Sequence, residues 1–261
     1  MLLHSNIIGD GTPFIILHGF FGMGDNWKTL GKRFSDPGNT GRDGFQVHLI
    51  DLRNHGRSFH SDDFNYNLMV EDLNEYCNYY KIEKFVLLGH SMGGKTAMFF
   101  AGTYQEKVSK LIVADIAPKE YPQHHQDILK ALSVLDFSEI KTRKEADEAL
   151  SVDIINLGVR QFLLKNIYWK EKGELALRMN LPVLIKHNEE IGKPLSEELI
   201  YNGDTLFLRG SESGYIVAGD EILIRKHFPK AIIETISNAG HWLHSENPTE
   251  FYQYVMNFLS L

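Results

Sequence analysis

Short, almost continuously apolar runs alternate with helical patterns along the first half of the chain, and this alternation limits the possible folds more than any other sequence feature. Strands have this composition when helices cover both faces of a parallel sheet, because neither side of the strand then meets water. The sequence therefore predicts an α/β fold with a crossover helix within residues 65–82. The runs are "FIILHG" at 14–19, "FQVHLIDL" at 45–52, "KFVLLGH" at 84–90 and "SKLIVADI" at 109–116.

The alternation stops between residues 118 and 200, where helical patterns replace strand patterns. Thr142 and Glu145, for example, have the spacing of a capping box at a helix start. We expect residues 1–117 and 201–261 to form one α/β core, with residues 118–200 inserted as a helical cap. Strand and helix patterns return as "DTLFLRG" at 204–210, "AIIETISN" at 231–238 and an amphipathic stretch at 248–261.

Charge and cysteine content exclude several classes of partner. With 27 basic and 34 acidic residues the net charge is −7, so we expect neither nucleic acid nor a membrane surface as a partner. Cys77 is the only cysteine, and the chain offers no run of about 18 apolar residues that could span a membrane. These features favour a cytoplasmic protein. His124 and His125 are adjacent but lack a third ligand at suitable spacing, so we expect no metal.

The pentapeptide "GHSMG" at 89–93 matches the pattern G-x-S-x-G, in which the serine can be a nucleophile. A serine at this place could equally be the N-cap of a helix. The context favours the nucleophile, since a predicted strand precedes Ser91 and a helical pattern follows it. Such a turn places the serine hydroxyl at the carboxyl edge of the sheet, where open α/β folds bind ligands.

A serine nucleophile needs a base and a carboxylate that orients the base. Of the 12 histidines, His241 is the best candidate, because it lies in the loop before the last helical pattern, 150 residues after Ser91. Asp115 ends a predicted strand and is the favoured acid. Glu212, after the next strand, remains an alternative, and so does Asp220, which is better suited to start a helix.

Acyl transfer also needs N–H donors for the developing oxyanion. We expect the backbone N–H groups of Met92 and Phe20, the second within the glycine-containing loop "LHGFFGMGDNW". The stretch "DLRNHGRS" at 51–58 is interpreted as a hydrogen-bonded loop that supports this region. The glycines at 19–24 lack both the G-x-G-x-x-G spacing and the lysine of a P-loop, which argues against a nucleotide.

Five motifs in this order resemble the α/β-hydrolase superfamily and, more narrowly, YbfF-type bacterial esterases and their mitochondrial relatives. The resemblance implies an eight-stranded, mostly parallel sheet with a helical cap between the sixth and seventh strands. It also implies a triad acid at Asp115, although "GSES" at 210–213 departs from the glycine-asparagine-serine run of the relatives and keeps Glu212 open. The motifs are "HGFFGMGDNW", "DLRNHGRS", "GHSMGGKTAM", "VADIAP" and "NAGHWLHSENP".

The resemblance implies a serine hydrolase that cleaves short- to medium-chain carboxylic esters, or acyl thioesters, without a cofactor. Phe162, Tyr168 and Trp169 of the predicted cap are candidates for an acyl pocket. The same triad could instead cleave carbon–carbon bonds or form peracids, and the fold could serve as a ligand-binding scaffold with little turnover. The sequence leaves the natural substrate and the oligomeric state open.

Overall fold

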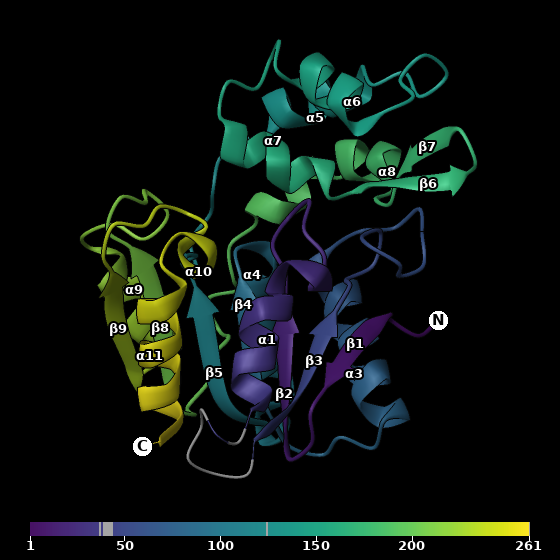
Figure 1. Ribbon diagram of the computed structural model, residues 1–261. Helices are drawn as coiled ribbons and strands as arrows, with labels where there is room; N and C mark the ends of the chain where they lie inside the picture. Colours follow the sequence, from purple (N-terminus) through teal and green to yellow (C-terminus); the bar gives the residue numbers. More distant parts are fainter. Residues whose placement is uncertain (37, 39–43, 124, 261) are drawn as a thin grey trace.

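The structure is a computed structural model that describes residues 1–36, 38, 44–123 and 125–260. Within these residues the central sheet has the strand order β1-β3-β2-β4-β5-β8-β9 (Figure 1). Only β1 runs antiparallel to its neighbour, and the other strand pairs are parallel, which confirms the α/β class. The strands are β1 Ser5–Ile8, β2 Thr12–Leu17, β3 Phe45–Ile50, β4 Phe85–His90, β5 Val108–Ala114, β8 Thr205–Gly210 and β9 Ala231–Ile236.

Both faces of the sheet are covered by helices, which explains the apolar strands. Successive side chains of a strand point to opposite faces, so Phe14 and Ile16 of β2 enter one hydrophobic core while Ile15 and Leu17 enter the other. Helices α1 and α11 complete the first core and α3, α4 and α9 the second (Figure 1). They are α1 Lys28–Ser35, α3 Tyr66–Tyr79, α4 Met92–Thr103, α9 Asp220–His227 and α11 Pro248–Ser260.

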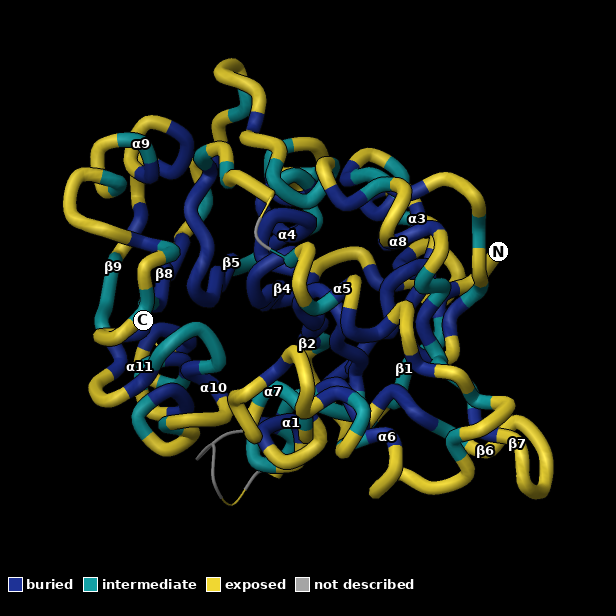
Figure 2. The backbone as a smooth tube through the Cα atoms, turned by 90° about the horizontal axis from the view of Figure 1, so that it is seen from above, coloured by how far each residue is buried: buried dark blue, intermediate teal, exposed yellow. Residues whose placement is uncertain are grey.

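The elements between β5 and β8 lie over the carboxyl ends of the strands, and we call them the insert (Figure 1). Seen from above, much of the insert is exposed, whereas β4, β5 and α4 of the core are mostly buried (Figure 2). The domain boundaries proposed from the sequence stay a prediction. The insert contains α5 Gln126–Ser133, α6 Arg143–Leu150, α7 Leu157–Leu164, β6 Ile167–Glu171, β7 Glu174–Leu177, α8 Leu181–Lys186 and the 3-10 helix η3 Asn188–Gly192.

Two details of the expected architecture are corrected. The central sheet of the described residues has seven strands instead of eight, because a single antiparallel strand, β1, precedes β2 and pairs at the edge with β3. The insert consequently follows the fifth strand of that sheet along the chain. It is also not wholly helical, since β6 and β7 form a separate antiparallel hairpin. The capping box is confirmed: Thr142 and Glu145 bond reciprocally at the start of α6.

No helix among the described residues has both the length and the apolar character needed to cross a membrane. The cytoplasmic location stays a prediction. The remaining short helices are η1 Gly24–Trp27, η2 Gln105–Lys107 and α10 Leu243–Glu246.

Candidate active site

Ser91 forms a strained turn between β4 and α4. Its backbone has φ 52° and ψ −120°, a conformation that costs free energy for any residue with a Cβ atom. The turn is held by a 3.0 Å hydrogen bond from the Ser91 N–H to the carbonyl of Ala114 in the neighbouring strand. Although Ser91 is the N-cap of α4, its hydroxyl makes no capping hydrogen bond. The hydroxyl is therefore available for another partner.

Two glycines allow the turn to be this tight. A Cβ atom on Gly89 would lie 2.1 Å from the carbonyl oxygen of Gly93, and one on Gly93 would lie 2.4 Å from the carbonyl oxygen of His18. Both clashes are with backbone atoms, which cannot rotate away. Strand β4, helix α4 and the loop after β2 can approach Ser91 this closely only because neither position has a side chain.

His241, in the loop between β9 and α10, connects Ser91 to a buried carboxylate. Its Nε2 lies 3.0 Å from Ser91 Oγ, and its Nδ1 lies 2.8 Å from Asp115 Oδ2. With the proton on Nδ1, the ring donates to Asp115 and can accept the hydroxyl proton of Ser91. The ring of Tyr215 stacks on the imidazole at 3.7 Å between centroids, and His90 Nε2 donates to the His241 carbonyl at 2.7 Å. The imidazole is thus fixed in orientation.

Asp115 lies directly after β5, is fully buried and has φ 51°. Its Oδ1 accepts a 3.1 Å hydrogen bond from the Gly210 N–H, and its Oδ2 accepts a hydrogen bond from the Ser213 hydroxyl. Burial raises the pKa of the Asp115 carboxyl to about 6, while the Ser213 and Gly210 donors lower it. These donors stabilise the ionised form that a carboxylate partner of His241 requires.

The other candidate acids occupy different places. Glu212 is exposed to solvent, and among the described residues its side chain makes no hydrogen bond to His241. Asp220 begins α9 and pairs with Lys119 at 2.6 Å. Asp115 is the carboxylate that the structure brings to His241. Ser213 was missed in the sequence, and the only signal for it was its position shortly after a strand that ends at the same sheet edge.

The loop after β2 lies against Ser91. A Cβ atom on Gly19 would be 3.2 Å from the Ser91 Cβ. Among the described residues, the backbone N–H groups of Phe20 and Met92 have no hydrogen-bond acceptor, whereas the Phe21 N–H donates to His55 Nε2 at 3.3 Å. Two N–H groups without an acceptor among the described residues therefore belong to the chain segments next to Ser91. Their role as oxyanion donors stays a prediction.

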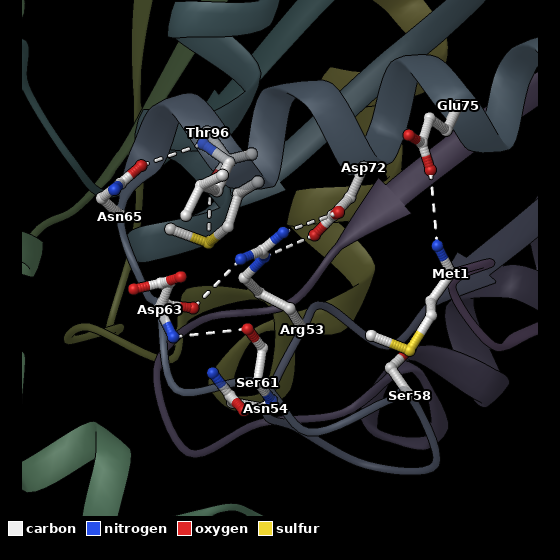
Figure 3. A network of polar contacts seen from close by, with 12 residues as sticks. Met1, Arg53, Asn54, Ser58, Ser61, Asp63, Asn65, Asp72, Glu75 and Thr96 are labelled. Atoms are coloured by element: carbon white, nitrogen blue, oxygen red, sulfur yellow. Dashed lines mark hydrogen bonds and ion pairs between the residues drawn. The ribbon is translucent and has the colours of Figure 1, made fainter.

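The loop at 51–58 supports this region through buried polar contacts. Asp51 accepts a 2.7 Å hydrogen bond from the Gly24 N–H, which holds the end of the loop after β2. Arg53 makes a two-pronged ion pair with Asp72 of α3, with distances of 2.6 and 2.8 Å, and donates to the Asp63 carbonyl at 3.0 Å (Figure 3). The bidentate geometry fixes the loop in one conformation.

Most histidines near Ser91 are buried and therefore neutral. Burial lowers the pKa of His18 to about 4 and that of His90 and His55 to about 3. His18 accepts a hydrogen bond from the Leu52 N–H at 3.0 Å, so it has a structural contact of its own. The imidazole that contacts the serine is that of His241, which keeps some access to solvent.

A cavity of about 270 Å³ opens beside Ser91. Phe162 of α7 lines it, as proposed from the sequence, but Tyr168 and Trp169 do not. These two belong to the β6–β7 hairpin, where Trp169 is 56% exposed and Tyr168 stacks under the guanidinium of Arg178. Among the described residues, no charged Lys, Arg, Asp or Glu side chain lines the cavity. The lining residues are His18, Gly19, Phe20, Phe21, Gly22, Asn26, Trp27, His90, Ser91, His125, Ile128, Val159, Phe162, Tyr215, His241, Trp242 and His244.

Several of these wall residues were missed in the sequence. Ile128 and Val159 come from the insert and Trp242 follows His241 directly, but nothing in their spacing indicates that they share a cavity. His125, considered above only for metal binding, contacts the ring of Phe20 at 5.2 Å between centroids. His124 lies outside the described residues, and the part of the chain that the structure describes contains no cluster of three or more candidate metal ligands.

A serine at a strand–helix turn, with a carboxylate and a histidine after later strands of a parallel sheet, defines the α/β-hydrolase class of site. A model of the alpha/beta hydrolase fold family matches residues 12–136. The chain belongs to the α/β-hydrolase family, because relatives that are 37% and 31% identical cover 99% and 96% of it.

The mouse sn-1-specific diacylglycerol lipase ABHD11 is 37% identical over 267 residues, covering 99% of this chain and 85% of the lipase. The esterase YbfF of Escherichia coli is 31% identical, covering 96% of this chain and 94% of YbfF. A solved structure described as a marine microorganism esterase superposes with a TM-score of 0.92 at 43% identity, covering 98% of this chain and 99% of that one. The resemblance to YbfF-type proteins is confirmed.

The close backbone approach at the turn can be tested by its effect on stability. Replacing Gly93 by alanine should lower the free energy of unfolding by about 2 kcal/mol or more, because the new Cβ would press on the His18 carbonyl. Gly214→Ala is the matched control, since nothing lies within 4 Å of its Cβ position, and it should change stability by less than about 1 kcal/mol. Urea unfolding measures both. Equal effects would contradict the packing described for the turn.

Proposed function

We propose that this protein is a serine hydrolase that cleaves carboxylic esters through an acyl-enzyme on Ser91. The proposal rests on two hydrogen bonds in series, between Asp115 and His241 and between His241 and Ser91, at the edge of an uncharged cavity. The relatives named esterase and lipase support the same reaction class. A scaffold without turnover would not need a strained turn that aims a hydroxyl at an imidazole.

In the first half-reaction, Ser91 Oγ attacks the carbonyl carbon of the ester while His241 Nε2 takes the hydroxyl proton. A positive imidazolium forms as the C–O bond to the serine forms. The ionised Asp115, 2.8 Å from His241 Nδ1, stabilises that charge and keeps the ring in the reactive tautomer. The orientation of the imidazole is already set by Tyr215 and His90, so little reorganisation is needed.

The carbonyl oxygen becomes an oxyanion in this step. The N–H groups of Phe20 and Met92 are the proposed donors, because neither has an acceptor among the described residues. Met92 directly follows Ser91, and Phe20 follows Gly19, whose Cβ position lies 3.2 Å from the Ser91 Cβ. Fixed backbone donors stabilise the transition state more than the ground state when they are aimed at the position of the developing charge. The loop at 51–58 holds the loop that carries Phe20 through hydrogen bonds from the Gly24 N–H to Asp51 and from the Phe21 N–H to His55. The ion pair of Arg53 and Asp72 in turn holds the loop at 51–58 on α3.

The tetrahedral intermediate then breaks its bond to the alcohol oxygen, and His241 returns its proton to the leaving alcohol. In the second half-reaction, a water molecule attacks the acyl carbon while His241 Nε2 takes a proton from it. The bond to Ser91 Oγ breaks, the serine is reprotonated by His241, and the carboxylic acid leaves. No cofactor is required for either step.

The lining of the cavity supports the proposal that the acyl group of the substrate is an uncharged chain of short to medium length. Phe162, Trp242 and Val159 provide apolar wall, and the lining lacks charged residues of the Lys, Arg, Asp or Glu type. A thioester could react in the same way, because its carbonyl is attacked at the same atom. Carbon–carbon bond cleavage and peracid formation use the same triad chemistry, and a panel of substrates separates them from ester hydrolysis.

The triad assignment predicts different effects of two carboxylate substitutions. Asp115→Asn should lower kcat for p-nitrophenyl butanoate by about a thousandfold or more, since the amide favours the wrong imidazole tautomer. Glu212→Gln should leave kcat within about twofold, because the exposed side chain does not contact His241. Ser91→Ala is the inactive reference for both. A large loss in Glu212→Gln with little loss in Asp115→Asn would reverse the assignment.

The hydrogen bond from Ser213 to Asp115 predicts a shift in pH dependence. Burial raises the pKa of Asp115 to about 6 and the Ser213 hydroxyl lowers it, so Ser213→Ala should raise the pKa further. Since ionised Asp115 is the active form, kcat/KM falls as the pH drops through the apparent pKa of the Asp115–His241 pair. The acidic limb of the variant should move up by about 0.5 to 1 pH unit, with kcat/KM at high pH nearly unchanged.

The exposed Ser211, in the same loop, gives a matched control. Ser211→Ala should leave the acidic limb of the kcat/KM profile where it is in wild type. Rates measured with a neutral ester across the pH range of stable protein decide the matter, and a Ser213→Ala profile that overlays the wild-type profile would refute the role given to this hydroxyl.

A further inference from the structure

Lys95 is a fully buried lysine one helical turn after Ser91 on α4. Its backbone N–H donates to the Ser91 carbonyl at 3.0 Å, so the two residues share one rigid turn. Burying an ammonium group costs several kcal/mol unless its donors are satisfied. Burial lowers the pKa of Lys95, and a lysine at this place therefore needs compensating contacts.

Those contacts are three backbone carbonyls, one for each N–H of the ammonium group. Lys95 Nζ donates to the carbonyl of Lys119 at 2.7 Å, to that of Gly192 at 3.2 Å, and to that of Lys193. The ammonium also lies 5.0 Å from the ring centroid of Tyr121. The three carbonyls come from two segments far apart in sequence, so Lys95 holds both to α4.

The two segments are the places where the chain enters and leaves the insert. We call residues 118–121 the first stem and residues 192–195 the second stem. They are bonded to one another at both ends, by Tyr121 N–H to Gly192 O at 2.9 Å and by Leu195 N–H to Pro118 O at 3.0 Å. The stems thus form a pair, and Lys95 bonds to this pair from the helix beneath the serine.

The stems position one wall of the cavity. The insert that they carry supplies Ile128, Val159 and Phe162 to the wall, whereas Lys95 itself does not line the cavity. The first stem also reaches the histidine, because the Tyr121 hydroxyl donates to the Tyr215 carbonyl at 2.6 Å and Tyr215 stacks on His241. His241 is also held by Asp115 at 2.8 Å and by His90 at 2.7 Å, neither of which belongs to the stems. A shift of the stems should therefore change the shape of the acyl pocket more than the contact between His241 and Ser91.

We propose that Lys95 is a positioning residue for substrate selection: by holding both stems of the insert on the helix of Ser91, it fixes the acyl pocket around longer chains. The kinetic part rests on the proposed ester hydrolysis, while the structural part does not. Lys95 touches no reacting atom and acts only through the stems.

The test compares wild type with Lys95→Met, which keeps an unbranched side chain of similar length and removes all three donors. Lys84→Met, at an exposed lysine before β4, is the matched control. Hydrogen–deuterium exchange should be faster in Lys95→Met at the Tyr121 and Leu195 amides, which bond across the stems, and unchanged within β4. Both variants are then assayed with p-nitrophenyl esters from acetate to octanoate, below the unfolding temperature.

Relative to wild type, Lys95→Met should lose about tenfold in kcat/KM for the octanoate ester and less than about threefold for the acetate ester. Lys84→Met should match wild type throughout. Unchanged exchange at the two stem amides would overturn the proposal, and so would an equal kinetic loss at every chain length, which a merely structural lysine would give. If wild type hydrolyses none of the esters, the proposed function fails while the exchange result still decides whether Lys95 holds the stems.

Should Lys95→Met not fold, Lys95→Gln replaces it, because the amide keeps two N–H donors. The same comparison then applies, with smaller changes of the same sign expected. If neither variant folds, Lys95 is required for folding as a whole and its proposed role in substrate selection is overturned.

Discussion

The whole site depends on one strained residue, Ser91, whose positive φ turns its hydroxyl away from the helix it precedes and toward His241. The strained conformation persists because the surrounding structure holds it. The backbone of Gly89 and Gly93 packs closely against neighbouring backbone, and the Ser91 N–H is hydrogen-bonded to the next strand. A relaxed turn would point the hydroxyl into a helix cap. Packing around the turn therefore directs the hydroxyl at the imidazole that contacts it.

Sheet topology brings the remaining groups to this turn. Strands β4, β5, β8 and β9 are neighbours in that order, and their carboxyl ends are followed by Ser91, by Asp115, by the loop of Ser213 and by the loop of His241. Groups up to 150 residues apart in sequence thus meet within hydrogen-bond distance. The parallel direction of these strands is what makes one edge of the sheet carry all four.

The fold class and the contacts among Ser91, His241 and Asp115 could be predicted because they depend on local patterns. These patterns are apolar runs, a glycine-flanked serine, and residues at strand ends. The cavity wall could not be predicted from the sequence, since it depends on how the insert packs. Trp169 looked like pocket wall by composition, but the β6–β7 hairpin carries it to the surface, and Phe162 reaches the cavity from α7. Lys95 gave no sequence signal, because the carbonyls that it contacts lie 24, 97 and 98 residues away along the chain.

Covalent trapping would show whether Ser91 is the nucleophile, as proposed. The protein is treated with a fluorophosphonate probe, digested and examined by mass spectrometry, with protein unfolded in urea as the control. We expect a single adduct on Ser91 in the folded protein and none after unfolding, because the proposed reactivity comes from the strained turn and from His241. An adduct on another serine, or no adduct in the folded protein, would contradict the proposal.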